Sequence, residues 1–537
     1  MRRHRWLSGV LMVWLSFWAV VYTQLSFRTV PLNGERSFNS PDETANFYFS
    51  RRIAAGDLIA APQVPGNLAG GIVHPRSMAV LQGKLVPLSF LGMPVWYGLA
   101  GRLAGPWIII FLTPLFAALG GWAFFRICND VFGRRVAFAA ALLLPLLPPW
   151  WYYSARSMFH NVAFFSLTLC SFAAVLAVHR HGRTFIAFFG GLSLGVALSL
   201  RLVEGVWILP LMLLAFIFCP RRYKRAWVWV AAGTVLAGLP VLFHQAATYG
   251  HFWQTGYLLP PAGSAVGSGG ASRTWQDFFP YGIHPRRAAS NAGHFLFGML
   301  PWIFWPAILG ILIQVLRWRE LNNHRRFYLV AFLAVSLFSL GYYGSAALQD
   351  NLDPQAVTLG VSYVRYWIPI YVAVLPFAVI GVQWVVKRFH SRFTRRLISM
   401  LLFGLASWLS VRATFYEPSE GLRSVASAIN AGYTKRSQVA AVVEPDAVIV
   451  AERSDKIFFP TYAVVGTLLD PAVQQNLPDV VAVRPVYYYS FLGGGDIETL
   501  QKNLQRYGLS LTEVMRMNQP PAAPEQLYRV TVQSNPN

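Results

Sequence analysis

The sequence predicts an α-helical polytopic membrane protein with about eleven transmembrane helices, a long first external loop carrying interfacial helices, and a small C-terminal external α/β domain. Three observations predict this fold class. The 537-residue chain is 55% hydrophobic and only 12% charged, which is unusual for a soluble protein. Its apolar residues fall in long runs. Its basic residues concentrate in short segments between these runs.

The candidate spans follow from the lengths of the apolar runs, because a helix needs about 20 mostly apolar residues to cross a bilayer. Such runs, several of them short, cover residues 6–27, 104–125, 136–152, 161–178, 184–200, 205–219, 226–245, 294–316, 327–345, 366–386 and 397–411. The first run follows basic residues, but it exceeds a signal-peptide core and lacks a small-residue cleavage site. We therefore expect a retained anchor.

The basic segments assign the sides of the membrane. Segments rich in Lys and Arg lie at 2–5, 126–135, 179–183, 221–225, 317–326 and 387–396, and they alternate consistently with the spans. Cytoplasmic loops carry such an excess of Lys and Arg. We therefore expect the N-terminus in the cytoplasm and the C-terminal domain outside. The net charge of +23 is then a property of these loops, and no nucleic-acid partner is expected.

The predicted transmembrane domain covers residues 1–411 and includes the first external loop, residues 28–103. Within this loop, segment 82–101 is apolar enough to suggest a further span, but prolines and glycines such as Pro87 and Pro94 interrupt it. Counting it as a span would also invert the side of every later basic loop. We therefore interpret it as an interfacial helix on the outer face.

Residues 412–537 are predicted to form the external α/β domain, because their apolar runs shorten to strand length. Strands are expected at 447–451, 486–491 and 527–532, with helices near 419–431 and 495–507. The segment AERSDK, residues 451–456, follows a predicted strand and is a surface candidate for contact with an acceptor.

Two adjacent carboxylates, Asp42 and Glu43, lie just beyond the first span. Within hydrocarbon a carboxylate would cost about 2.5–3.5 kcal/mol, whereas at the outer interface it stays ionised. Pro41 is typical of a helix start, and acids in the first turn complement the helix dipole. Spacing alone therefore leaves two interpretations, a helix N-terminus or a reactive acid.

The surrounding residues support the second interpretation. The segments PDETANFYFSRRIAAGDLIAAP (41–62) and VHPRSMAVLQGKLVPLSFLGMPV (73–95) resemble the first external loop of GT-C class membrane glycosyltransferases. The P-D-E-T core is similar to that of lipid A aminoarabinose transferases. His74, Pro75 and Lys84 resemble the His-Pro motif and Lys of protein O-mannosyltransferases. Weaker likenesses occur in YYSARSMFHNVAFF, GVALSLRLVEGVWILP, YGHFWQTGY and VSYVRYWIPIY, so the resemblance covers roughly residues 6–390.

The resemblance implies an enzyme of the bacterial inner membrane that moves a sugar from a polyprenyl-phosphate donor to an envelope acceptor on the outer face. Such a reaction needs a carboxylate that deprotonates the acceptor hydroxyl, cations that hold the leaving phosphate, and an apolar groove for the prenyl chain. We predict Asp42 as the general base. Glu43 is a second catalytic candidate, but on a helix it faces about 100° away from Asp42.

The candidate phosphate and donor ligands are external cations near the ends of spans: Arg201, Arg365, Arg76, Lys84 and His74. Arg201 corresponds to a basic residue that the family has between its fifth and sixth spans, and Glu204 is placed to orient it. Arg365 lies among aromatic residues at the start of a late span. An interfacial structural role is the alternative for both arginines. We expect both to converge toward the first external loop.

The candidate acceptor cleft contains Arg156, His160, Trp253 and Tyr257, of which the aromatic residues suit stacking against a sugar. No metal site is predicted, because His74 and His160 lack an evident third ligand. The three cysteines show no paired spacing and lie in or beside apolar runs. No cofactor is therefore expected, and a divalent cation is not indicated.

Two departures from the family and two other functions remain. The region before the fourth span, Phe159-His160-Asn161, lacks an acid. Ala45-Asn46 follows P-D-E-T where lipid A transferases have Arg, which argues against aminoarabinose transfer.

A transporter or flippase of lipid-linked saccharides would bury charge at mid-span, whereas these spans are almost free of charge. An O-antigen polymerase or ligase would use outer arginines without an essential acid.

Overall fold

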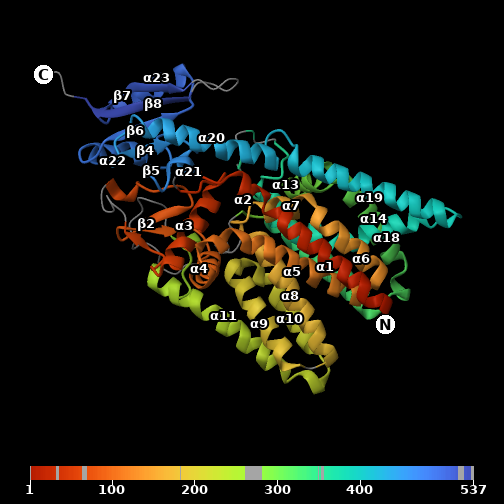
Figure 1. Cartoon of the computed structure of the whole chain (residues 1–537). Coiled ribbons are helices and arrows are strands. Elements are labelled where there is room, and N and C mark those ends of the chain that lie inside the picture. The colour runs from red at the N-terminus through yellow and green to blue at the C-terminus, as the bar shows by residue number, and fades with distance from the viewer. Residues whose placement is uncertain are drawn as a thin grey trace. The chain divides into compact units, whose positions relative to one another are not determined.

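The computed structural model describes residues 2–31, 35–62, 69–181, 183–259, 281–348, 350–351, 353, 356–517 and 525–533. The chain divides into two compact units, each assembled from segments that are far apart in the sequence (Figure 1). The first unit contains residues 1–28, 110–240 and 271–425. The second unit contains residues 29–109, 241–270 and 426–537.

The first unit is helical. Its elements are α1 (Arg2–Tyr22), α2 (Gln24–Arg28), α5 (Leu112–Phe132), α6 (Arg134–Leu143), α7 (Pro148–Ala155), α8 (His160–His181), α9 (Thr184–Leu200), α10 (Gly205–Ile217), α11 (Ala226–Tyr249, which runs into the second unit), α13 (Pro285–Ala292), α14 (Pro301–Leu316), α15 (Asn323–Tyr342), α16 (Ser362–Tyr366), α17 (Ile368–Ala373), α18 (Leu375–Val386) and α19 (Arg392–Phe415).

All eleven predicted spans coincide with helices. Among the described residues, seven helices are long and apolar enough to cross a membrane, which makes the chain a multi-pass membrane protein. Two further apolar segments are pairs of helices bent by 50° before Pro148 and by 107° before Pro301, each a broken span or a re-entrant loop. Proline accounts for such bends because it lacks the backbone N–H that would continue the helix. Helices α9 and α10 are shorter, so the count of eleven crossings stays a prediction.

The second unit contains two sheets. Strands β1 (Ala61–Pro62), β2 (Met78–Leu81) and β3 (Lys84–Pro87) form an antiparallel sheet in the order β1-β3-β2. Strands β4 (Val448–Ala451), β5 (Ala463–Val465), β6 (Val486–Ser490), β7 (Leu509–Met517) and β8 (Glu525–Val532) form a mixed sheet in the order β5-β4-β6-β8-β7. The helices are α3 (Pro41–Ala55), α4 (Gly92–Ala104), α20 (Leu422–Ala440, which begins in the first unit), α21 (Asp455–Phe458), α22 (Pro471–Val481) and α23 (Gly494–Gln505).

The interfacial helix predicted over residues 82–101 is wrong in its first half, which contains strand β3. Gln82 and Gly83 have φ angles of 50° and 72°, so they make the two-residue turn of a hairpin in which Leu81 pairs with Lys84. The helix α4 begins only at Gly92. Local hairpin geometry therefore overrides the apolar composition of this segment.

Helix α3 carries the acidic pair in its first turn, and Pro41 begins it. It ends at Gly56, whose φ of 96° is suited to glycine and whose N–H donates to the carbonyls of Arg52 and Ile53. A Cβ on Gly98 of α4 would lie 2.5 Å from the Cβ of Ile53, so the glycine allows the two helices to pack closely. This packing fixes the direction of α3.

The first external loop and the C-terminal sheet of the second unit share one hydrophobic core. Phe49 and Ile53 of α3 belong to the same buried cluster as Ile449 of β4, Phe458 of α21 and Tyr487 of β6. Helices α3 (red) and α21 (blue) lie side by side (Figure 1). The ring centroids of Tyr48 in α3 and Phe459, just after α21, are 4.9 Å apart. The C-terminal sheet is thus part of the support of the acidic helix.

Candidate functional site

The two adjacent carboxylates have different surroundings. Asp42 is half-buried, and its Oδ1 accepts a hydrogen bond of 2.6 Å from the hydroxyl of Ser77. Glu43, the next residue along α3, is only 2% exposed. Asp42 therefore retains access to solvent, whereas the side chain of Glu43 is enclosed within the fold.

The turn His74-Pro75-Arg76-Ser77 holds the residue that contacts Asp42. Ser77 has a φ of 62°, in the left-handed region that few non-glycine residues adopt. The Nδ1 of His74 lies 3.0 Å from the carbonyl of Pro75, and burial lowers the pKa of His74 below its ordinary value. The role of His74 as a donor ligand stays a prediction.

Arg76 is engaged by the C-terminal segment. Its Nε and Nη2 donate to the same Oδ1 of Asp455, at 2.8 and 2.6 Å, and its backbone N–H donates to Oδ2 at 2.8 Å. Asp455 is fully buried. The prediction that AERSDK forms an exposed contact surface is wrong for its acids. Glu452 is also buried, and it accepts hydrogen bonds from the Thr467 hydroxyl and the Leu468 N–H.

The first unit brings three predicted arginines together on two aromatic rings. The guanidinium carbons of Arg156 and Arg365 lie 4.8 and 4.9 Å from the ring centroid of Phe159. Arg365 also lies 5.2 Å from the ring of Tyr366, and Arg201 lies 4.8 Å from that same ring. We call these five residues the arginine–aromatic cluster.

A buried carboxylate orients Arg201. Glu204 is 1% exposed, and its Oε1 accepts from Nη2 of Arg201 at 3.0 Å and from the hydroxyl of Tyr343 at 2.7 Å. Its Oε2 accepts from the indole N–H of Trp207 at 2.6 Å. With two of its partners neutral, this carboxylate and Arg201 form a hydrogen-bonded network that fixes the guanidinium.

A hydroxyl and a second carboxylate orient Arg365. Its Nη2 donates to the hydroxyl of Ser362 at 2.7 Å, and Ser362 donates from its hydroxyl and backbone N–H to Asp350 at 3.0 and 2.8 Å. Tyr281, which precedes α13, is close enough to Arg201 and Arg365 for their charges to act on it. Burial nevertheless raises the pKa of Tyr281 to about 12, so its phenol stays protonated as a hydrogen-bond donor.

The remaining predicted residues lie apart from these groups or add little to them. Lys84 is exposed at the start of β3, and His160 is 8% exposed at the start of α8. Trp253 and Tyr257 are 54% and 61% exposed in the second unit, where Trp253 stacks on His251. Arg201 and Arg365 belong to a different unit from Asp42, so their convergence on the first loop stays a prediction.

No metal site is evident in the part of the chain that the structure describes, because no three His, Cys, Asp or Glu side chains there are grouped to hold an ion.

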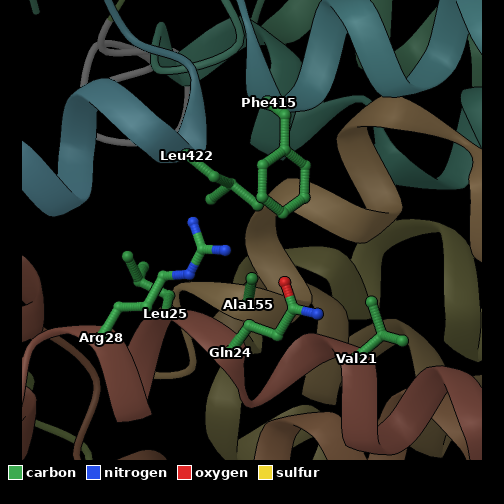
Figure 2. Close-up of a pocket in the computed structure, with 7 residues that line it drawn as sticks. All are labelled: Val21, Gln24, Leu25, Arg28, Ala155, Phe415 and Leu422. Atoms are coloured by element: carbon green, nitrogen blue, oxygen red, sulfur yellow. The ribbon is translucent and has the colours of Figure 1, made fainter.

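The first unit also contains a large apolar cavity. It has a volume of about 610 Å³, and its walls come from α5, α8, α10, α15 and α17. Trp207, which donates to Glu204, forms part of its wall. A second cavity, between the end of α1 and Phe415 and Leu422, measures about 10 Å³ and has the polar ends of Gln24 and Arg28 beside it (Figure 2). That volume holds about one water molecule. Of these two cavities, the larger one therefore suits a ligand.

The sequence did not reveal Ser77, Ser362, Asp350, Tyr281 or Tyr343 as site residues, and it singled out the segment of Asp455 only for contact with an acceptor. Ser77 directly follows the His-Pro-Arg residues that drew attention, and Ser362 lies three residues before Arg365. Proximity to a candidate residue was therefore the one available signal, and it did not identify the carboxylate that each serine contacts.

Comparison with known proteins gives structural relatives alone, because no family model and no curated protein matches the sequence. ArnT from Cupriavidus metallidurans bound to undecaprenyl phosphate is 13% identical with a TM-score of 0.54, over 97% of this chain and 98% of that one. An Archaeoglobus fulgidus oligosaccharyltransferase in complex with Zn and sulfate is 13% identical with a TM-score of 0.52, over 97% of this chain and 73% of that one. Both are GT-C glycosyltransferases.

The chain has the GT-C fold. This confirms the resemblance seen in the first external loop, and it extends that resemblance over nearly the whole length of the chain.

Proposed function

We propose that the protein is a membrane glycosyltransferase that moves a sugar from a polyprenyl-phosphate donor to an envelope acceptor on the outer face. The observation that carries the proposal is the arginine–aromatic cluster, which hydrogen bonds through Glu204 connect to Trp207 in the wall of the 610 Å³ apolar cavity. A polyprenyl-phosphate sugar combines an anionic head with a long apolar chain. Arginines suit the first part, and an apolar cavity suits the second.

The link between cluster and cavity is a pair of hydrogen bonds. Trp207 presents its ring to the cavity and its N–H to Glu204, and Glu204 in turn binds Arg201. A phosphate bound by Arg201 and Arg365 would therefore have its prenyl chain close to the cavity wall. The GT-C fold supports this assignment, and the ArnT structure holds a polyprenyl phosphate.

The proposed reaction is a displacement at the anomeric carbon of the donor sugar. The acceptor hydroxyl oxygen forms the new bond to that carbon, the bond from the carbon to the phosphate oxygen breaks, and polyprenyl phosphate leaves with the electron pair. Asp42 accepts the proton of the hydroxyl, and the arginines stabilise the charge that develops on the phosphate. Asp42 suits this role better than Glu43, because Glu43 is 2% exposed.

A deletion strain tests the proposal. Mass spectrometry of its envelope glycans should show the loss of one sugar and the accumulation of the corresponding lipid-linked donor. Wild-type protein should restore the sugar, and Asp42→Asn at matched expression should not. A complete envelope in the deletion strain would contradict the proposal. Restoration by Asp42→Asn would instead favour a transporter or a polymerase, because neither needs this base.

A further inference from the structure

We infer that Ser77 is a positioning residue for Asp42, and that the C-terminal segment holds Ser77 in place through the Arg76–Asp455 ion pair. The inference rests on the proposed function, since it assumes that Asp42 is the base. It gives the C-terminal sheet a part in catalysis that neither its composition nor its fold indicates.

The first step is the contact between Ser77 and Asp42. The hydroxyl of Ser77 donates to Oδ1 of Asp42 at 2.6 Å, which is short for such a bond and typical of a charged acceptor. The backbone of Ser77 has a φ of 62°, so this serine occupies a conformation that glycine would adopt more readily. A strained serine where glycine would be easier indicates that the hydroxyl itself is needed.

The second step is what keeps the turn in this conformation. Asp455, at the start of α21, is fully buried and accepts from the backbone N–H, the Nε and the Nη2 of Arg76. The same Nη2 donates to the carbonyl of Arg453 at 2.6 Å. On the other side of Ser77, its carbonyl accepts the N–H of Leu88. The turn is therefore fixed on both sides of the serine.

The third step concerns the other side of Asp42. Lys456, the neighbour of Asp455, donates from its Nζ to the carbonyl of Asn39 at 2.6 Å, directly before α3. Helix α21 thus contacts both the segment that precedes Asp42 and the turn that binds its carboxylate. A base must have its oxygen within hydrogen-bond reach of the proton it takes, and these contacts restrict where that oxygen lies.

The decisive variant is Ser77→Gly, because the two possible roles predict opposite results. Glycine relieves the left-handed backbone, so a purely structural serine would be replaced without loss. If the hydroxyl positions and stabilises the ionised carboxylate, kcat should fall about tenfold with the apparent KM for donor unchanged. The acid limb of the pH–rate profile should also move to higher pH. The donor used is the radiolabelled lipid-linked sugar extracted from the deletion strain.

The link to the C-terminal segment is tested with Asp455→Asn. The amide keeps the size of the carboxylate but loses the charge that binds Arg76. The turn then holds Ser77 less firmly against Asp42, so kcat should fall several-fold. Glu525→Gln is the matched control, because Glu525 also forms an ion pair in this sheet, with Lys435, and has no hydrogen bond to the turn. It should retain wild-type kcat and its pH profile.

The outcomes separate the inference from the proposed function. Wild-type kcat and pH profile in Ser77→Gly, with Asp42→Asn inactive, would overturn the positioning role alone. Activity of Asp42→Asn would overturn the assignment of the base itself. Equal losses in Asp455→Asn and Glu525→Gln would show that the C-terminal sheet acts only through stability. A double variant Ser77→Gly/Asp455→Asn that is no slower than Ser77→Gly would support action through one contact.

Discussion

The candidate base and the candidate phosphate ligands differ in one kind of contact, because only the arginines also lie against aromatic rings. In the second unit, Asp42 receives a short hydrogen bond from Ser77. In the first unit, Arg156, Arg201 and Arg365 lie against the faces of Phe159 and Tyr366. Arg201 and Arg365 also donate hydrogen bonds to Glu204 and Ser362, so each of these guanidinium groups is held by a ring and by a directional contact.

This difference matches the needs of the two roles. A general base acts through one oxygen, which must be directed at one proton, so a single directional hydrogen bond is suitable. A phosphate presents several oxygens, so its ligands need charge and several donors. The comparison therefore predicts that changes near Asp42 alter turnover, whereas changes in the arginine–aromatic cluster alter donor affinity.

The largest expected effect is that of Asp42→Asn. The amide keeps the shape of the side chain but cannot accept the proton of the acceptor hydroxyl, so transfer should fall about 10²- to 10⁴-fold. Asp57→Asn is the control, because Asp57 is an exposed acid just beyond the same helix. Incorporation of labelled sugar into envelope acceptors measures both. Glu43→Gln should reduce transfer less than Asp42→Asn, and an equal or larger reduction would transfer the role of base to Glu43.

The next largest effect is expected for Arg201→Gln and Arg365→Gln. Each loses charged hydrogen bonds, which contribute roughly 1.5–3 kcal/mol, so the apparent KM for donor should rise about ten- to a hundredfold. Arg365→Lys should remain impaired, because lysine lacks the planar fork. Arg484→Gln, which removes an exposed ion pair with Asp446, is the control. A lower kcat at unchanged KM in the arginine variants would break the proposed division of roles.

A smaller effect is expected when the apolar cavity is narrowed. Ala331 lines the cavity, and Ala331→Phe should raise the apparent KM several-fold, since lost apolar contact costs about 0.8 kcal/mol per CH₂ group. The increase should occur for a long-chain donor and disappear for an analogue with one or two isoprene units. Equal increases for both donors would place the prenyl chain elsewhere.

The smallest effect concerns His74 and stability at mildly acidic pH. Burial lowers the pKa of folded His74, so the unfolded chain binds the proton more readily. Stability should therefore decrease as pH falls from above the ordinary histidine pKa of about 6.5 toward the lower folded value. His74→Gln should show a weaker decrease over that interval in thermal unfolding of the detergent-solubilised protein. An identical pH dependence in the variant would exclude His74 as the source.

The sequence predicts helices well and contacts poorly in this protein. Apolar runs placed every candidate span on a helix, and the strands β4, β6 and β8 lie where short apolar runs predicted them. Both signals are local, because they depend on residues within one element. Strand β3 was mistaken for helix, since the hairpin depends on the backbone of Gln82 and Gly83 rather than on hydrophobicity.

The candidate site shows the same limit. The P-D-E-T core identified Asp42, and flanking aromatics identified Arg365, because both lie in unusual local sequence. The partner of Arg76 could not be predicted, because Asp455 lies 379 residues further along the chain. The cluster of Arg156, Arg201 and Arg365 likewise depends on how the ends of α7 and α9 pack against α16. No periodicity in the sequence specifies which helix faces another across such distances.

Donor binding and turnover measured on the same purified Asp42→Asn protein test the central claim most directly. Undecaprenyl phosphate is the binding probe, and single-turnover transfer from labelled lipid-linked sugar reports the chemistry. The account predicts a Kd within about threefold of wild type, which is a change in binding free energy well under 1.4 kcal/mol. It predicts a transfer rate at least about 100-fold lower than that of wild type. A transfer rate within about threefold of wild type would contradict Asp42 as the base of a glycosyltransferase.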